Sequence, residues 1–410
     1  MIARKIAMAC AVVLVANAQA VETEVSFVSP TIVKISRVPD PANPGADTGV
    51  CLPGLPSLPV NEQNTGKGRR YASDSLVVCV AENGAVSFAD ARTGRVLLAE
   101  DASQPVVITP VVRENVIYDD ATARVEDTAN GQVTVKAVLR RDTIGTDYAY
   151  ALNLDFGNPG ALYGLGSHIE GYMNLLGKTL HLTQHNLKAS VPVLVSPAGY
   201  GVLVDAGCAM KFSSDSVPGG YTGKMELDAA DRLDYYFIKG ARLDDVVAGY
   251  RALTGAVSMM PRHLFGYTQS KERYTSQHEL IDVASEYRRR GLPLDMIVQD
   301  WNYWPEGWGY MKMDERFYPD PAALADSLHA MDVKLMVSIW PNPQGCPQER
   351  DFRERGYMLP NSVYDAFNPD ARRHYWEYAD KEFFSRGFDA WWCDSSEPVD
   401  GDWNQLPPPV

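Results

Sequence analysis

Two carboxylates follow a short aromatic strand late in the sequence. Asp394 and Glu397 come after the run Gly-Phe-Asp-Ala-Trp-Trp-Cys, which begins at Gly387. A rigid carboxylate at the end of a strand can attack the anomeric carbon of a sugar directly. Asp394 could equally cap the following turn, and Glu397 could complete a capping box with it. The residues alone therefore leave a catalytic and a structural role open for both.

Aspartate and tryptophan also occur together at other predicted strand ends. Asp300 and Trp304 follow one apolar run, and Trp340 follows the next. Trp392 lies in the strand that Asp394 ends. Carboxylates accept hydrogen bonds from sugar hydroxyls, and exposed aromatic surface in a loop usually marks a binding site. We predict a carbohydrate site at these positions, with ion pairing of Asp300 and core packing of the tryptophans as the alternative roles.

The elements that would position these residues alternate between strand and helix. Four nearly continuous apolar runs predict strands, at residues 264–270, 295–301, 334–341 and 389–395. Helical patterns separate them, at residues 276–291, 320–333 and 370–387. Continuous apolar strands are typical of a parallel sheet buried on both faces, and (β/α)8 barrels carry their active sites at the carboxyl ends of the strands. Residues 256–410 are therefore predicted to form the first half of a (β/α)8 TIM barrel.

An antiparallel β-sandwich is predicted for residues 21–255, so the chain is expected to be multidomain. Short alternating runs are broken there by Asn-Gly, Asn-Pro-Gly and Ala-Gly turns about every ten residues, which is typical of a sandwich. The apolar period then changes to that of a helix, closed by Gly255. Five apolar residues are predicted to share one face of this helix: Leu243, Val246, Val247, Tyr250 and Leu253.

The first twenty residues have the pattern of a secretory signal peptide. Arg4 and Lys5 precede an apolar stretch, and Ala18-Gln19-Ala20 forms a small-residue cleavage site. The stretch is shorter than the roughly 20 residues that a membrane helix needs. We therefore expect cleavage after Ala20, a secreted or periplasmic protein, and no membrane span in the mature chain.

Charge and cysteine content restrict the ligands that the chain could bind. The formal net charge is −14, so nucleic acid is a poor partner and a neutral substrate fits better. The five cysteines after the leader include no Cys-x-x-Cys pair, and the histidines have no metal-binding spacing. We therefore predict no metal and no cofactor. A bridge between Cys51 and Cys79 remains possible in an oxidising compartment.

Three strings resemble glycoside hydrolase family 31, the α-glucosidase and α-xylosidase family, and most of all its bacterial α-xylosidase-like branch. They read GFDAWWCDSSEP, DMIVQDWNYWPEGWGYMKMDERFYPDP and KLMVSIWPNP. The resemblance implies a retaining α-glycosidase that hydrolyses terminal α-linked sugars of oligo- or polysaccharides. It implies that Asp394 is the nucleophile, that Asp300 binds a sugar hydroxyl, and that Trp340 and Trp392 line the cleavage subsite.

The resemblance also places the catalytic acid/base well downstream of the nucleophile, which here means beyond Val410. The sequence is therefore expected to be a fragment of a longer enzyme, truncated after the nucleophile strand, with little or no activity alone. Asp402 could be proposed as the acid, but it departs from the order of the family. Which sugar is cleaved is left open.

Two alternatives to hydrolysis remain. The chain could be a non-catalytic carbohydrate-binding protein on the same scaffold. It could also be a barrel enzyme of another class, such as an aldolase or isomerase. That class needs a Schiff-base lysine or a phosphate-binding loop, and neither occurs at a predicted strand end.

Overall fold

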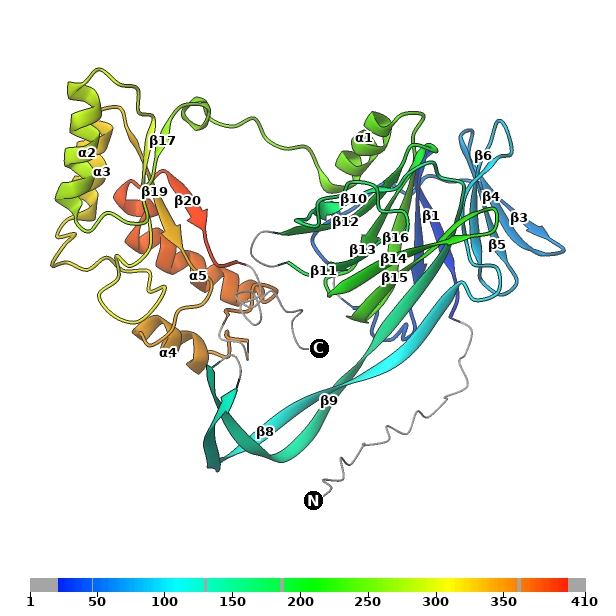
Figure 1. Cartoon of the computed structure of the whole chain (residues 1–410), viewed down its shortest axis with the longest axis horizontal. Coiled ribbons are helices and arrows are strands. Elements are labelled where there is room, and N and C mark those ends of the chain that lie inside the picture. Colours follow the sequence, from blue (N-terminus) through cyan, green and yellow to red (C-terminus); the bar gives the residue numbers. More distant parts are fainter. Residues whose placement is uncertain (1–20, 46, 129–130, 185–187, 360–362, 397–410) are drawn as a thin grey trace, which may run out of the picture. The chain divides into compact units, whose positions relative to one another are not determined.

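The computed structural model describes residues 21–45, 47–128, 131–184, 188–359 and 363–396 (Figure 1). The predicted leader, Glu397 and Asp402 lie outside these ranges. The chain divides into two compact units, the first ending at Ala256 and the second beginning at Val257. Within the described ranges, the helices are all too short or too polar to span a bilayer.

The first unit is built from two antiparallel sheets, as the turn pattern predicted. The six-stranded sheet has the order β1 (Glu24–Ser29), β2 (Ile32–Arg37), β16 (Leu233–Lys239), β13 (Tyr200–Asp205), β12 (Ala189–Ser196) and β10 (Tyr163–Ser167). The ten-stranded sheet has the order β11 (Thr179–Leu182), β14 (Met210–Val217), β15 (Gly220–Ala230), β9 (Gly131–Gly157), β7 (Val96–Glu100), β6 (Val86–Asp90), β5 (Leu76–Ala81), β4 (Gly68–Ala72) and β3 (Asn61–Thr65), with β8 (Val106–Thr128) paired to β9.

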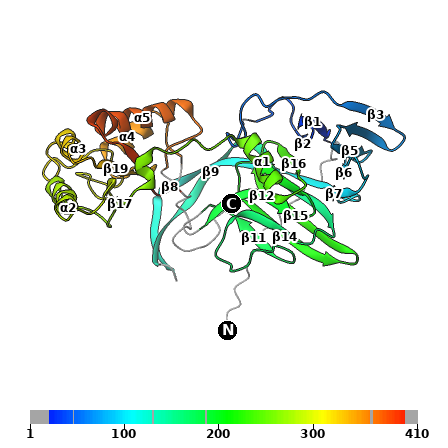
Figure 2. The same cartoon turned by 90° about the horizontal axis from the view of Figure 1, so that it is seen from above.

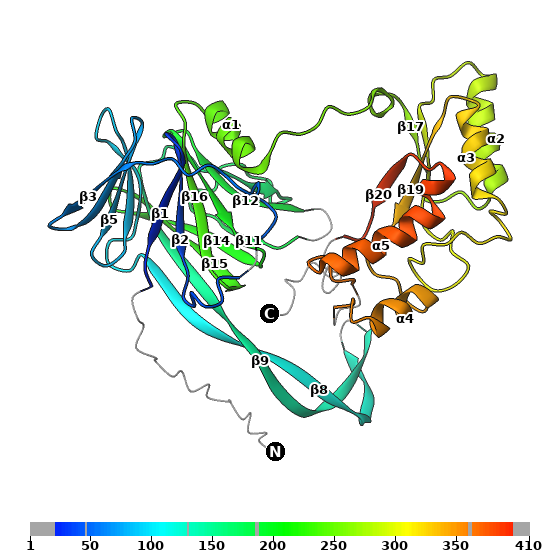
Figure 3. The same ribbon diagram turned by 180° about the vertical axis from the view of Figure 1, so that it is seen from behind.

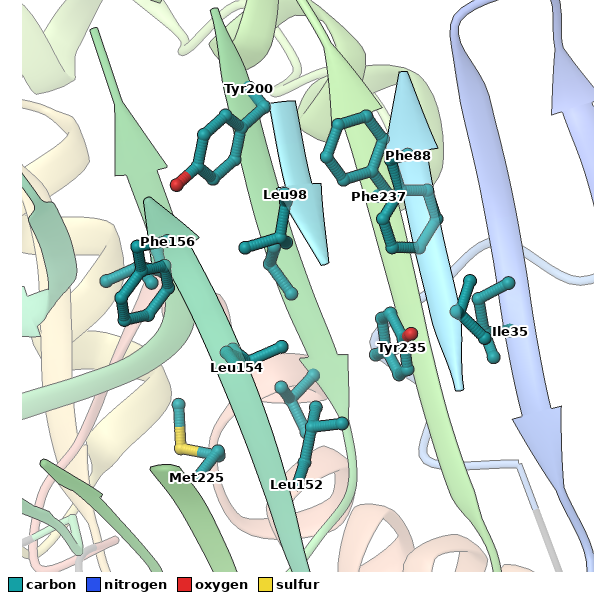
Figure 4. Packing of buried hydrophobic residues seen from close by; sticks show 14 of the residues in the cluster. Ile35, Phe88, Leu98, Leu152, Leu154, Phe156, Tyr200, Met225, Tyr235 and Phe237 are labelled. Carbon is teal, nitrogen blue, oxygen red and sulfur yellow. The ribbon is translucent and has the colours of Figure 1, made fainter. Parts of the chain in front are cut away.

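Alternate residues of the six-stranded sheet form the core between the two sheets. Ile35 of β2 and Tyr235 and Phe237 of β16 are fully buried there (Figure 4). Phe237 stacks on Phe88 of the other sheet with ring centroids 4.2 Å apart. This alternation follows from the two-residue period of a strand, which sends neighbouring side chains to opposite faces.

A buried ion pair joins the two sheets at the ends of β2 and β7. Arg37 donates two hydrogen bonds to the carboxylate of Glu100, at 2.9 and 2.8 Å. The hydroxyl of Tyr235 donates to Glu100 at 2.7 Å, and the backbone N–H of Val86 donates at 2.9 Å. The Arg37 guanidinium also donates to the carbonyl of Gly84 at 2.9 Å. The ion pair is thus bidentate, and further hydrogen bonds satisfy both charged groups. Burying a charge requires such an arrangement.

The other face of the six-stranded sheet is covered by α1 (Leu243–Thr254). Val246 and Leu253 are fully buried in a cluster with Ile238 of β16. The predicted helix exists, but the predicted apolar face was partly wrong, because Leu243 and Val247 are exposed. A helix lying on a sheet buries a narrow stripe, and neither residue falls in it.

Truncating Leu253 is expected to destabilise this unit. Leu253→Ala leaves a cavity beneath α1, and we expect the free energy of unfolding to fall by about 2–5 kcal/mol. Leu243→Ala is the matched control in the same helix, and its exposed side chain is expected to contribute within about 0.5 kcal/mol. Urea denaturation of the two variants measures the difference, and equal losses would contradict the assignment of the buried stripe.

Strands β8 and β9 are longer than the sequence pattern predicted. The alternating runs between residues 131 and 157 suggested separate short strands, yet β9 is one strand of 27 residues. Its partner β15 pairs only with residues 148–157, and beyond them β8 and β9 pair with each other alone (Figure 2). The pairing of β8 with β9 shifts register along this polar segment, and neither strand ends there.

The possible bridge between Cys51 and Cys79 is not formed. Both are free thiols, and Cys79 is exposed on β5. Burial and the nearby Asp205 carboxylate raise the pKa of Cys51 to about 12, against a weaker opposing hydrogen bond. Cys51 therefore stays protonated over the physiological range.

The second unit contains a four-stranded parallel sheet in the order β17 (Thr268–Gln269), β18 (Met296–Gln299), β19 (Lys334–Ile339) and β20 (Ala390–Cys393) (Figure 3). The helices of the unit are α2 (Gln277–Arg289), α3 (Pro321–His329), α4 (Pro347–Glu354) and α5 (Pro369–Glu382), with short 3₁₀ turns at Arg262–Phe265 and Phe384–Arg386. Side-chain caps at Ser276, Asp320 and Asn368 begin α2, α3 and α5.

One face of this sheet is packed against helices. Ile297, Leu335 and Val337 share a buried cluster with Leu280 of α2 and Leu324 of α3. The four strands and three of the helices were predicted from the sequence. Helix α4 was missed, because its eight residues are mostly charged and only two of them, Gln348 and Phe352, are buried.

Candidate active site

Asp300 and Asp394 emerge on one face of the parallel sheet, at the carboxyl ends of β18 and β20. The register pairs Val298 with Met336 on β19, and Ser338 with Trp392 on β20. Paired residues of parallel strands point to the same face, and residues two apart on a strand share a face. Asp300 therefore lies on the same face of the sheet as Val298, and Asp394 on the same face as Trp392. This face is the one opposite the helices.

The backbone around Asp394 fixes the carboxylate. Its N–H donates to the carbonyl of Ile339 at 3.0 Å, which continues the β19–β20 ladder by one residue. One carboxylate oxygen accepts a hydrogen bond from the N–H of Ser395 at 2.8 Å. Ser395 has a φ of 53°, a left-handed conformation that is uncommon outside glycine. The chain thus turns sharply after the strand and leaves Asp394 half-buried, and among the described residues no hydrogen bond is formed by its second oxygen.

Asp300 repeats this arrangement on β18. One of its oxygens accepts from the N–H of Trp301 at 2.8 Å, and the next residue, Asn302, has a φ of 60°. Burial raises the pKa of Asp300 above its ordinary value, and the negative charges of Asp394 and Glu272 raise it further, against the opposing hydrogen bond from Trp301. Asp300 therefore interacts electrostatically with Asp394 and with Glu272, which follows β17.

The raised pKa of Asp300 predicts that its charge opposes folding. Above that pKa the ionised carboxylate is less stable in the folded protein, and as the pH falls through it protonation removes the penalty. Asp300→Asn keeps the oxygen that accepts from Trp301 and cannot ionise. We expect it to raise the unfolding free energy near pH 7, by less than about 1 kcal/mol after solvent screening, and to lose this advantage toward pH 4.

Thermal unfolding at the two pH values measures this effect. Asp326→Asn, at an exposed position of α3, is the control for replacing a carboxylate in the same unit. A variant that is less stable than the wild type near pH 7 would show that Asp300 contributes to the fold rather than to a site.

An aromatic cluster lies beside the two carboxylates. Trp304 and Trp340 meet edge to face with centroids 5.0 Å apart, and Trp308 lies 5.6 Å from Trp304. Trp301 lies 5.8 Å from Trp308, and the Arg273 guanidinium lies 5.7 Å from a ring of Trp301. Residues from the loops after β17, β18 and β19 thus converge at one edge of the sheet.

The exposed tryptophans agree only in part with those that the sequence singled out, since Trp392 is exposed but Trp304 and Trp340 are not. Trp340 and Trp304 are only 2% and 7% exposed, so they form the inner part of the cluster. Trp308 is 38% exposed and Trp392 is 42% exposed, so these two indoles offer surface to a ligand. Trp308 was not singled out before, although its position in a loop with many aromatic residues was a usable signal.

The loop that carries Trp308 is held by the loop after β19 and by α4. Trp308 and Gln344 exchange two backbone hydrogen bonds, at 2.7 and 2.9 Å. The buried side chain of Gln348 accepts from the N–H of Met311 at 2.9 Å. Gly309 has a φ of 63°, and a Cβ added there would lie 3.0 Å from that of Trp340. The missed helix α4 therefore helps to position the exposed indole.

These groups suit a polyhydroxylated neutral ligand. Two carboxylates accept hydrogen bonds, and exposed indole faces pack against apolar ring surface. Among the described residues no group of histidine, cysteine, aspartate and glutamate is arranged to hold a metal ion. Glu397, for which a capping role was considered, and Asp402 lie outside the described ranges.

The comparison with protein families gives one match, to the glycosyl hydrolases family 31 TIM-barrel domain over residues 257–409. The chain is also 38% identical to an α-xylosidase of Saccharolobus solfataricus, over 58% of this chain and 34% of that protein. A family 31 glucosidase of Pseudescherichia vulneris, itself uncharacterised, is 31% identical over 58% of this chain and 47% of that protein.

A solved structure supports the same relationship for nearly the whole chain. It is a family 31 α-xylosidase from a soil metagenome, complexed with xylose, with a TM-score of 0.73 and 26% identity. The match covers 92% of this chain and 55% of that one. The chain thus spans between a third and somewhat over half of the length of these relatives. The antiparallel first unit and the parallel second unit are consistent with a β-sandwich and a TIM-barrel domain, and residues 257–409 match the TIM-barrel domain of glycoside hydrolase family 31.

Proposed function

We propose that the protein is a secreted, retaining α-glycosidase with Asp394 as its nucleophile. The observation that supports this most directly is the placement of Asp300 and Asp394 on one face of the sheet, at the carboxyl ends of β18 and β20, which lie on either side of β19. An α-xyloside is the favoured substrate and an α-glucoside the second, because α-xylosidases are prominent among the relatives and an α-glucosidase is also among them. Secretion follows from the leader pattern of residues 1–20.

In this mechanism a carboxylate oxygen of Asp394 attacks the anomeric carbon, and the bond to the leaving oxygen breaks. A second carboxyl group donates its proton to that oxygen and later removes a proton from the water that hydrolyses the glycosyl ester. Asp300 accepts a hydrogen bond from a hydroxyl of the same sugar. Burial and nearby negative charges raise the pKa of Asp300, and a hydrogen bond from a sugar hydroxyl would offset both effects on the ionised carboxylate.

The second carboxyl group is proposed to come from barrel strands beyond those described. A retaining enzyme holds its two carboxyl groups about 5–5.5 Å apart. The described residues of the second unit form four parallel strands, and the match covers 34% of the α-xylosidase. We therefore propose that these residues supply the first half of the barrel and that turnover needs the remainder.

Covalent trapping tests the proposed nucleophile. A 5-fluoro-α-xylosyl fluoride forms a long-lived ester with the nucleophile of a retaining enzyme, and mass spectrometry of digested protein locates the ester. We expect it on the peptide that contains Asp394, in a protein with the complete barrel. An ester on another carboxylate would overturn the assignment.

Turnover of 4-nitrophenyl α-xyloside and α-glucoside tests the remaining parts of the proposal. We expect the longer protein to hydrolyse the xyloside and the 410-residue chain to show little activity. Comparable rates for both would show that the described half of the barrel already holds the acid. Sugar binding with no turnover by the longer protein would favour the non-catalytic alternative.

A further inference from the structure

Two adjoining pockets lie on the outer face of the six-stranded sheet in the sandwich unit. Their volumes are about 640 and 300 Å³, and Lys34 and Arg232 line both of them. We call the two pockets together the outer groove. Pockets that bind small molecules have volumes of roughly 300–1,000 Å³, so each has room for a sugar ring and the pair suits a short chain of rings.

The sheet presents two rows of polar side chains to the outer groove. One row pairs Ser26 of β1 with Lys34 of β2, and Lys34 with Tyr236 of β16. The neighbouring row pairs Glu24 of β1 with Ser36 of β2. The residues between them on β2 and β16 are buried in the core between the two sheets, so both rows face outward. The sheet therefore fixes the spacing of these groups.

A loop forms one wall of the smaller pocket, which is lined by residues from the segment 47–57. The backbone N–H of Leu52 donates to the carbonyl of Leu253, at the end of α1, at 2.8 Å. The hydroxyl of Thr48 donates to the carboxylate of Asp205 on β13 at 2.5 Å. The protein itself thus holds this wall in place, so a ligand would lose little affinity to ordering of the loop.

Hydrogen-bond donors lie at the centre of the outer groove. The side chains of Lys34 and Arg232 are 27% and 22% exposed. Both pair with the buried carboxylate of Asp234, at 2.6 and 2.9 Å. Arg232 also donates to the carbonyl of Pro44 and to Asp47. An ammonium group has three N–H donors and a guanidinium group has five, so both cations keep donors beyond these contacts.

Hydrogen-bond acceptors lie on β1 at the edge of the groove. Glu24 lines the larger pocket and Ser26 the smaller one, and both residues are exposed. Within the described ranges, neither side chain forms a hydrogen bond or an ion pair. The carboxylate and the hydroxyl are therefore accessible to a ligand without breaking a contact of the protein.

The charges around the groove favour a neutral ligand. Four carboxylates line it beside the two cations, namely Glu22, Glu24, Asp47 and Asp205. An anion would be repelled by this excess of negative charge. Pro39, Pro41 and Pro44 add apolar surface to the larger pocket. Donors, acceptors and apolar surface in one groove match a sugar, which has hydroxyls around an apolar ring face.

We propose that the outer groove binds two or more consecutive residues of a neutral oligosaccharide. Glu24 and Ser26 accept hydrogen bonds from sugar hydroxyls, and Lys34 and Arg232 donate to hydroxyl and ring oxygens. The choice of a glycan as the ligand rests on the proposed function. The groove itself only binds, and a second binding site on the same chain raises the effective concentration of a polymeric substrate.

The test uses the 410-residue chain with the barrel carboxylates replaced, Asp300→Asn and Asp394→Asn. Xylotetraose, maltotetraose and the acidic tetragalacturonate are titrated separately and followed by saturation-transfer NMR. We expect a neutral tetrasaccharide to bind and the acidic one not to bind. Adding Ser26→Trp fills the smaller pocket and is expected to weaken binding at least tenfold. Glu24→Gln is expected to weaken it several-fold, because a hydrogen bond to a charged acceptor is lost.

Gln63→Trp is the control for an added indole, because it lies at an exposed position of β3, and it is expected to leave binding unchanged. Absence of binding by either neutral tetrasaccharide would overturn the proposal, as would preferential binding of tetragalacturonate. Binding that is unaffected by both Ser26→Trp and Glu24→Gln would also overturn it, since the sugar would then occupy another surface. Turnover is not measured, so this test can fail while the longer protein hydrolyses xyloside, and the reverse.

Discussion

Asp394→Asn is expected to lower turnover of 4-nitrophenyl α-xyloside by about ten thousand-fold or more, which is the scale of effect that removing a catalytic nucleophile has in other enzymes. The amide keeps the oxygen that accepts from Ser395 N–H, so the strand end should retain its geometry. It cannot form the glycosyl ester, because the neutral amide oxygen is a poor nucleophile. The measurement is the steady-state rate in the protein with the complete barrel.

The matched control lies at the opposite end of the same strand. Asp389 precedes β20 and accepts from the backbone N–H of Leu335 at 2.9 Å and from Lys334 at 3.0 Å. In barrels this end of a strand serves stability rather than chemistry. Asp389→Asn should therefore keep turnover within a few-fold of the wild type. A similar loss in both variants would mean that Asp394 acts through folding.

Chemical rescue separates a nucleophile from an acid. In Asp394→Gly the space left by the carboxylate admits azide, which can attack the anomeric carbon from the same side. We expect azide to restore turnover of an activated xyloside and to give a β-xylosyl azide, with inverted configuration. A product of retained configuration would instead assign Asp394 as the acid/base.

Glu100→Gln is expected to lower the unfolding free energy of the sandwich unit by about 3–5 kcal/mol, because it leaves the Arg37 charge buried without a counter-charge. The amide can still accept hydrogen bonds on one side, but its NH₂ group faces a donor of the guanidinium. The loss is read from urea denaturation followed by circular dichroism.

A surface pair in the same unit is the control. Glu226 and Lys211 are 3.2 Å apart, and both are more than one-third exposed. Glu226→Gln should change stability by less than about 1 kcal/mol. The double variant Arg37→Met, Glu100→Leu should recover much of the loss, since it removes both charges together. Equal effects of the two single variants would show that the buried pair contributes no more than a surface one.

Most of the fold could be predicted, because local pattern and tertiary structure agree in it. The apolar runs that become β18, β19 and β20 are continuous, and clear caps begin the helices between them. Helix α4 has almost no apolar stripe and is held by tertiary contacts of a few side chains, among them its two buried residues Gln348 and Phe352, so periodicity could not reveal it. The length of strand β9 could not be predicted either, because its central part is held by pairing with β8 and not by burial.

The site could be predicted only in its strand-end residues. Asp300 and Asp394 follow apolar runs, so a parallel sheet brings them to one edge. The left-handed turn at Ser395 has no sequence signal, and that at Asn302 has only a weak one, because asparagine tolerates this conformation better than most residues. Which indoles are exposed depends on how two loops pack on each other, so sequence could not separate Trp308 from Trp304.

The distribution of aromatic residues gives the two units different optical properties. All eight tryptophans of the sequence lie at or after residue 301, so the sandwich unit contains none. Indole emission therefore follows the barrel unit alone, whereas the far-ultraviolet spectrum contains the strands of the sandwich as well as the helices of the barrel unit. One unlabelled sample can thus report the folding of the barrel unit separately from that of the whole chain, and a sugar that reaches Trp308 or Trp392 will quench or shift the emission without any added probe.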